Sequence, residues 1–156
     1  MPAQPNPGDS LSDVGHVLRY VRKKFVDPNN NQIDGNAFLS RPAEVGGPSF
    51  NWIEFFAGDI TARIEEIRQL RRLKYEKRGR VAWLNVGQTN SYVRNQTQRL
   101  IDFISDPLHE DAARSWPADP SHAYLSNIPV IDTPEGEANG DLIAHCIVES
   151  WPVVPD

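Results

Sequence analysis

The 156-residue sequence contains a single cysteine, Cys146. One cysteine excludes a disulfide within the chain and any zinc site built from several thiolates. Long hydrophobic runs are also missing, whereas a membrane-spanning helix needs about 20 consecutive apolar residues. The first thirteen residues have neither a basic start nor an apolar centre. We therefore expect no signal peptide, no membrane association and a cytoplasmic protein.

Motifs that mark common enzyme classes are absent as well. The segment VGQTN, which follows an apolar run, lacks the glycines and the lysine of a phosphate-binding loop. The chain has no G-x-S-x-G motif and no sequence context typical of a catalytic cysteine. These absences leave catalysis open, but they argue against an independent enzyme, and we expect no cofactor.

What is present is typical of one compact domain. Hydrophobic residues make up 39% of the chain and charged residues 24%, which is close to the average for globular proteins. Residues 1–13 are rich in proline and offer almost nothing to bury, so a flexible N-terminal arm is expected there. Residues 14–156 are long enough for a single α+β domain.

Charge is distributed unevenly along the chain, although the net charge is only −5. Residues 59–80 carry eight Lys/Arg against four Asp/Glu, and residues 81–156 carry three against eleven. Two such regions either present opposite charges to partners or neutralise each other inside the fold. Mutual neutralisation is the simpler expectation.

Alternating apolar residues predict strands in the N-terminal third. HVLRYVRK, residues 16–23, has one largely apolar face, and turn-forming residues follow at 27–35. AFLSR, residues 37–41, is predicted to return as a second strand. SFNWIEFF, residues 49–56, is predicted as a third. Together these three segments predict an antiparallel meander.

The period changes after Gly58. Apolar residues recur at every third position from Ile64 to Leu73, and Gly79 is a natural stop, which predicts a helix over residues 60–78. Further along the chain, the pattern predicts strands at 80–86 and 99–105, a short helix at 90–97, a long loop at 106–134 and a last helix at 140–151.

Together these elements predict an α+β fold. We expect an antiparallel sheet of about five strands, packed on one face by two main helices, residues 60–78 and 140–150.

Glu54 lies among large apolar residues in the stretch GGPSFNWIEFFAG. A carboxylate in such surroundings is costly unless it is paired or reaches water. It is therefore either a general acid or base or one half of a structural ion pair. No nucleophile is apparent beside it, so we expect an ion pair with Arg41 or Arg19 that supports the sheet.

Four residues of the predicted 106–134 loop could hold a divalent metal ion: His109, Asp111, Asp119 and His122. Their spacing matches no compact metal motif, so they are more simply interpreted as turn residues, and no metal is expected.

The histidines also suggest an acid–base role. His16 and His122 could act together in phosphodiester cleavage, which uses two imidazoles in some enzymes. A single sequence does not show whether they meet. Catalysis by His16, His122 or Glu54 therefore stays a weaker alternative.

Basic residues cluster in and after the predicted helix 60–78. Clustered cations on one face could contact phosphates of a nucleic acid, or a protein partner. The chain is acidic overall, however, and it has no recognisable nucleic-acid-binding motif. The candidate binding residues are Arg68, Arg71, Arg72, Lys74 and Arg78.

The pattern V-L-R-Y-V, R-P-x-E, S-x-N-W-I-E-x-F and D-P-S-H resembles a group of small, functionally uncharacterised bacterial proteins of about this length. The resemblance covers most of residues 16–152 and implies a bacterial source, without a catalytic role for any residue. The residues that carry it are Arg19, Tyr20, Arg41, Pro42, Glu44, Asn51, Trp52, Glu54, Asp119, Pro120, Ser121 and His122.

From these observations we expect a small cytosolic accessory protein that acts through a protein partner, one encoded beside it in the same operon. Its four tryptophans are residues of a type that carries interface energy. Two alternatives stay open: a nucleic-acid-binding protein that uses residues 63–80, and a metal- or histidine-dependent hydrolase or nuclease. Homodimerisation through a sheet edge also stays open.

Overall fold

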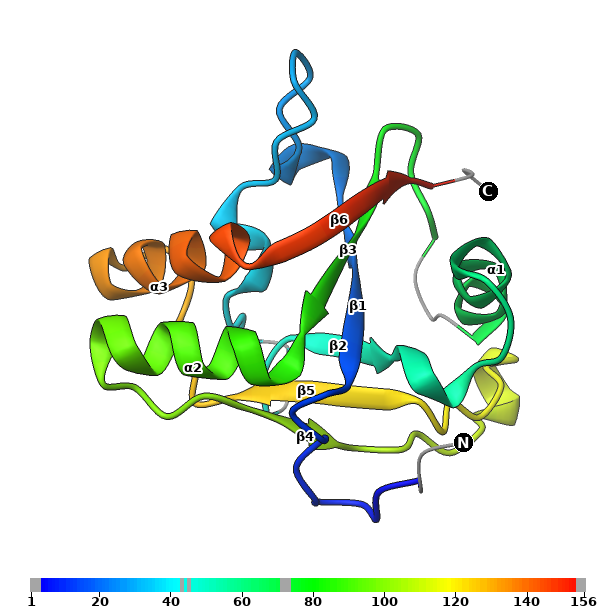
Figure 1. The fold of residues 1–156 in the computed structure, drawn as a ribbon. Coiled ribbons are helices and arrows are strands. Elements are labelled where there is room, and N and C mark those ends of the chain that lie inside the picture. Colours follow the sequence, from blue (N-terminus) through cyan, green and yellow to red (C-terminus); the bar gives the residue numbers. More distant parts are fainter. Residues whose placement is uncertain (1–3, 43, 45, 71–73, 154–156) are drawn as a thin grey trace.

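The computed structural model describes residues 4–42, 44, 46–70 and 74–153. Its core is an antiparallel sheet with the strand order β4-β5-β2-β1-β3-β6 (Figure 1). The six strands are β1 (His16–Val21), β2 (Ser49–Trp52), β3 (Arg80–Asn85), β4 (Asp102–Ser105), β5 (His122–Ser126) and β6 (Ile147–Pro152). The helices are α1 (Ile60–Leu70), α2 (Val86–Thr97) and α3 (Pro134–His145), and short 3-10 helices are η1 (Lys23–Phe25), η2 (Gly35–Phe38), η3 (Ile53–Phe55) and η4 (Ala112–Arg114). The predicted α+β class is confirmed.

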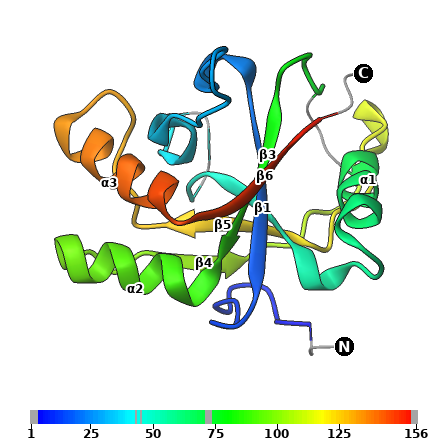
Figure 2. The ribbon, with the colours of Figure 1, turned by 45° about the horizontal axis from the view of Figure 1, so that its top comes forward.

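Helices cover both faces of the sheet, not one face as predicted. Val17 and Val21 of β1 face a cluster that includes residues of α2 and α3, whereas Leu18 faces a second cluster with Ile67 of α1. Figures 1 and 2 accordingly show α2 and α3 on one side of the sheet and α1 on the other. The reason lies in the central strands, since Val17 and Leu18 are both buried and each face needs a cover.

This arrangement also separates α1 from α3, which belong to the two charged regions of the sequence. α1, which carries two Arg and two Glu, and the acidic α3 pack on opposite faces (Figure 2). These two helices therefore do not neutralise each other by contact. None of the helices in the described residues is long and apolar enough to cross a membrane.

The predicted second strand, residues 37–41, is wrong. Its first residues belong to η2, whose start is capped by the Asp34 side chain accepting a hydrogen bond from Asn36 N at 2.8 Å. Phe38 and Leu39 are both fully buried, which a one-sided strand does not allow. The third predicted strand is shorter than residues 49–56, because η3 follows β2 directly.

Strand β5 was missed, because it lies inside the predicted 106–134 loop. Ala123 and Leu125 are fully buried, and the strand is inserted between β4 and β2. The residues before it form a hairpin closed by two backbone hydrogen bonds of 2.9 Å between Leu108 and Asp119. Because turn-forming residues precede it, this five-residue strand was not predicted from the sequence.

The predicted last helix, residues 140–151, is divided between two elements. α3 begins earlier, at Pro134, where the Thr133 hydroxyl accepts a hydrogen bond from Gly136 N at 3.0 Å. β6 takes the C-terminal half and pairs with β3. The predicted helix 60–78 is likewise too long, since residues 74–79 lie outside α1 and Leu73 lies outside the described residues. Ile64, Ile67 and Leu70 do pack inward, as predicted.

The end of the N-terminal arm lies against the sheet. Gly8 N donates to Ser105 O at 2.8 Å, and Leu11 N donates to Phe103 O at 2.9 Å. The Leu11 side chain is buried in the core. Residues 8–11 therefore cover the outer edge of β4, and ordered contacts begin before the expected boundary at Val14.

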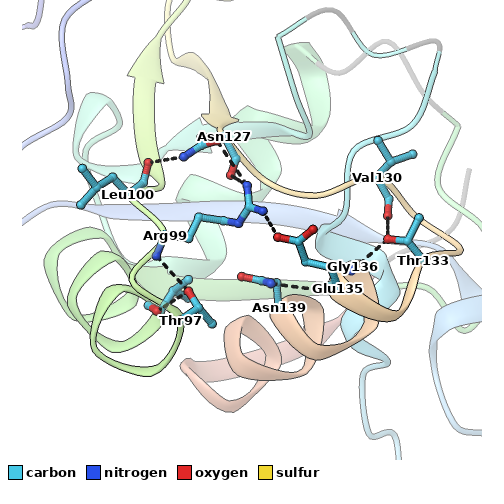
Figure 3. A network of polar contacts seen from close by, with 10 residues as sticks. Thr97, Arg99, Leu100, Asn127, Val130, Thr133, Glu135, Gly136 and Asn139 are labelled. Carbon is cyan, nitrogen blue, oxygen red and sulfur yellow. Dashed lines mark hydrogen bonds and ion pairs between the residues drawn. The ribbon is translucent and has the colours of Figure 1, made fainter.

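A polar network connects the start of α3 to the residues just before β4 and just after β5 (Figure 3). Arg99 bridges the two regions, because its Nη1 donates to Asn127 O at 3.0 Å while its Nη2 pairs with Glu135 Oε1. Asn127 Nδ2 in turn donates to Leu100 O at 3.0 Å. These contacts hold α3 against the face that is opposite α1.

The backbones of η2 and α3 touch at two glycines. A Cβ atom at Gly140 would lie 2.6 Å from Gly35 O. We expect Gly140→Ala to destabilise the protein by about 1–3 kcal/mol, as overpacking does, and to lower the melting temperature by several degrees in a calorimetric scan. The matched control is Asp141→Ala at the next, exposed position of α3. Equal melting of both variants would contradict this close contact.

Candidate functional site

A pocket of about 160 Å³ lies between α1 and the sheet. Its floor is a row across three strands, because Leu18 of β1 pairs with Asn51 of β2, which pairs with His122 of β5. The remaining pocket residues are Arg19, Tyr20, Ser49, Ile67, Leu70, Tyr75, Leu108 and Asp119. An apolar lining with a few polar groups is typical of a small-molecule site.

His122 is held firmly at one side of this pocket. Its Nδ1 lies 2.8 Å from the backbone oxygen of Asp106 and 3.3 Å from the carboxylate oxygen Oδ2 of the same residue. A carbonyl oxygen only accepts, so Nδ1 carries the proton in this hydrogen bond. In the neutral ring Nε2 is then an acceptor.

Ser49 provides the group that faces this acceptor. Its Oγ lies 3.0 Å from His122 Nε2, so the hydroxyl donates to the imidazole. Ser49 is the first residue of β2 and is solvent-exposed. Ser49, His122 and Asp106 thus form a hydroxyl–imidazole–acceptor chain, the arrangement that activates a serine as a nucleophile.

The backbone of Ser49 is fixed by a buried arginine. Arg19 Nη1 donates to Ser49 O at 2.7 Å, and Arg19 Nε donates to Ala37 O at 2.7 Å. Desolvation by burial lowers the pKa of Arg19 to about 10, although Glu44 opposes that shift. The guanidinium therefore stays charged at neutral pH and fixes the start of β2.

A second network fixes the segment that leads into β5. Asn51 Nδ2 donates to Asp119 Oδ2 at 2.9 Å and to Ser121 Oγ at 2.8 Å. Asp119 Oδ1 accepts from Ser121 N at 3.1 Å and from Ser121 Oγ at 2.7 Å. Because Ser121 immediately precedes His122, these bonds help to set the position of the imidazole.

Glu54 pairs with His16, not with Arg41 or Arg19 as predicted. Glu54 Oε1 lies 2.7 Å from His16 Nδ1, and Glu54 Oε2 accepts from His16 N at 3.1 Å. Arg19 points to the opposite face of β1, where its guanidinium lies 5.6 Å from the centre of the Phe50 ring. Arg41 lies 5.0 Å from the Phe25 ring. Alternation along β1 thus places His16, and not Arg19, on the face that Glu54 reaches.

The two histidines are not brought into one site. His16 contacts the edge of Trp83 at 5.1 Å between ring centres and does not line the pocket that contains His122. The hypothesis that both imidazoles act on one phosphodiester therefore lacks the required geometry.

The four metal candidates are also dispersed. Asp111 accepts from Arg114 Nη1 at 2.7 Å, and this hydrogen bond lowers the pKa of the Asp111 carboxyl. Asp119 and His122 have the partners given above, and His109 is exposed on the hairpin. Within the described ranges no group of three or more His, Cys, Asp or Glu side chains could hold a metal ion.

Three of the five basic candidates, Arg68, Lys74 and Arg78, lie within the described residues. Arg68 pairs with Glu65 at 3.2 Å, and Lys74 and Arg78 are exposed in the segment after α1. Arg71 and Arg72 lie outside the described residues.

Cys146 is buried, and burial raises the pKa of its thiol, so it is a poor nucleophile.

Comparison with family models, curated proteins and solved structures found no match to this chain. The interpretation of the pocket therefore depends on its own geometry.

Sequence reasoning found His122 but missed Ser49 and Asp106. Alternation in SFNW does place Ser49 and Asn51 on one face of a strand. The missing information was β5, since without that strand neither His122 nor Asp106 could be placed beside Ser49.

The pair of His16 and Glu54 can be tested by a double-mutant cycle. Both side chains are partly exposed, at 31% and 21%, so we expect a coupling energy of only about 0.5–1 kcal/mol. Urea unfolding of His16→Ala, Glu54→Ala and the double variant measures it. Glu66→Ala, at an exposed position of α1, is the control and should leave stability unchanged. Strictly additive losses would show that the pair is not coupled.

Proposed function

We propose that the protein is a hydrolase of small acyl esters, with Ser49 as nucleophile and His122 as general base. The observation that carries the proposal is the hydrogen bond of 3.0 Å between Ser49 Oγ and His122 Nε2 at a pocket, with Nδ1 anchored on Asp106. The sequence had left a histidine-dependent hydrolase as an alternative, and the proposal now names its substrate class and its two catalytic residues.

The geometry supports a two-step reaction. Ser49 Oγ attacks the ester carbonyl carbon while its proton moves to His122 Nε2, and the imidazolium returns this proton to the departing alcohol. A water molecule then gives a proton to the same nitrogen and attacks the acyl-serine. The acid leaves as Ser49 regains its proton. Asp106 keeps Nδ1 protonated throughout and stabilises the imidazolium.

The size and lining of the pocket indicate the substrate class. A volume of about 160 Å³ is below the range of roughly 300–1,000 Å³ that drug-sized ligands occupy. Leu18, Ile67 and Leu70 provide apolar walls. A short acyl chain fits these walls better than a peptide or a polynucleotide does.

The decisive assay is ester hydrolysis with p-nitrophenyl acetate and butyrate. Ser49→Ala and His122→Ala should each lower kcat/KM by about 10²–10⁴-fold, the usual contribution of such groups. Matched controls are Ser126→Ala, further along β5, and His145→Ala, an exposed residue of α3. Wild-type rates in the Ser49→Ala variant would contradict the proposal. A fluorophosphonate probe should in addition modify Ser49, as located by mass spectrometry.

The two acceptors on Asp106 make a further prediction. The backbone oxygen holds Nδ1 at 2.8 Å, whereas the carboxylate oxygen lies at 3.3 Å and is nearly half exposed. Asp106→Asn should therefore lower kcat much less than His122→Ala does. Measured kcat values of the two variants test this, and equal losses would show that the carboxylate is the main anchor.

A protein partner in the cytoplasm, the function predicted first from the sequence, has a separate observation in its favour. A wide groove of about 1060 Å³ runs between residues 24–36 and the segment formed by α3 and β6. Asp27, Asp34, Glu137 and Asp141 line it, so it would favour a basic segment. Pull-down with the wild type and with a Glu137→Lys/Asp141→Lys variant tests this second candidate function. We expect the wild type to capture a protein that the variant does not capture, and capture of the same protein by both would contradict this candidate.

A further inference from the structure

Asp119 is a buried carboxylate at the wall of the candidate site. Only 5% of the residue is exposed, and it lines the same pocket as Ser49 and His122. The hydrolytic steps proposed above give it no chemical role. Burial of an ionised group is costly unless charge or hydrogen bonds compensate, so Asp119 requires partners.

The partners of Asp119 are all neutral donors. Oδ2 accepts from Asn51 Nδ2 at 2.9 Å, and Oδ1 accepts from Ser121 N at 3.1 Å and from Ser121 Oγ at 2.7 Å. A carboxylate has about four acceptor positions, so one remains, on Oδ2. In the part of the chain that the structure describes, no Lys, Arg or His forms an ion pair with Asp119.

The buried Arg19 does not neutralise this carboxylate. Arg19 contributes to the pocket wall, but its guanidinium bonds to Ala37 O and Ser49 O and packs over Phe50, in the cluster on the other face of the sheet. Its formal charge is also opposed by Glu44 at 3.8 Å. Among the residues that the structure describes, the pocket side of Asp119 is thus a carboxylate with no cation paired to it.

We propose that the pocket recognises a small ligand with a protonated amine, which donates to Asp119 Oδ2 while an apolar chain lies against Leu18, Ile67 and Leu70. The substrate part of this inference rests on the proposed hydrolase. The amine would be carried by the acyl group whose ester carbonyl faces Ser49.

The distance along β2 between Ser49 and Asn51 sets the length of the ligand. Asn51, which bonds to Asp119, and Ser49 lie two residues apart on the same face of β2, which corresponds to about 6.6 Å along a strand. An ammonium group about four bonds from the ester carbonyl carbon spans such a distance. Esters of a 4-aminobutanoate type therefore fit both ends.

Binding is tested first, because it does not require hydrolysis. Butylammonium and butanol have similar size, and calorimetric titration or ligand-observed NMR measures their affinities. We expect butylammonium to bind at least tenfold more tightly to the wild type, and this preference to vanish in Asp119→Asn. Glu110→Gln, which removes an exposed carboxylate of the hairpin outside the pocket lining, is the matched control and should keep the preference. Equal binding of the two compounds by the wild type overturns the inference.

Hydrolysis is tested with a second matched pair. Methyl 4-aminobutanoate and methyl pentanoate differ by an ammonium group in place of a methyl group, and a pH-stat measures acid release from each. A preference of tenfold or more in kcat/KM for the amine supports the inference. Hydrolysis without preference overturns it and leaves the hydrolase standing. Amine binding without hydrolysis of either ester overturns only the hydrolase. The wild-type comparisons decide the question even if Asp119→Asn fails to fold.

Discussion

The buried guanidinium of Arg19 is the interaction on which the site most depends. It leaves the central strand β1 toward the face covered by α2 and α3, and it donates to Ala37 O in η2 and Ser49 O in β2. A buried charge of this kind must be satisfied on several sides. Its geometry therefore ties three segments that are distant in sequence, and it fixes where β2 begins. Since Ser49 is that first residue, an interaction on one face of the sheet positions a hydroxyl on the other.

The two faces of the sheet thus serve different purposes. One face forms the larger hydrophobic cluster under α2 and α3, reinforced by the contacts of Arg99 (Figure 3). The other face is covered by α1, of which only Ile67 is fully buried. Because α1 covers this face incompletely, a small pocket remains above Asn51 and His122. The first face thus carries the larger buried cluster, and the second has a pocket with polar side chains.

Local periodicity explains how much of this could be predicted. β1, β3 and the start of α1 have clear apolar patterns, and the structure confirms them. η2 and β5 do not, because η2 depends on the Asp34 cap and on close contact with α3, and β5 is short and surrounded by turn residues. Glu54 was recognised as a group that needed a partner. The identity of that partner depends on which face of β1 the Glu54 side chain reaches. Alternation along the strand places His16 on that face.

The candidate site was harder to predict for the same reason. His122 and Asp119 were singled out by residue type, and Asn51 by the resemblance. Their common location follows only once β5 is placed beside β2. The hairpin before β5 then brings Asp106 to His122 and Asp119 to Asn51. Long-range strand order, which a single sequence expresses weakly, therefore decides which of the polar residues can act together.

The most direct test of the account is the protonation of the His122 ring. Long-range ¹H–¹⁵N NMR, with His122 assigned through a His122→Gln variant, distinguishes the two neutral tautomers at a pH where the ring is uncharged. The account predicts a proton on Nδ1, donated to Asp106, and a bare Nε2 facing Ser49. A proton on Nε2 would contradict it, because His122 could not then accept the proton of Ser49.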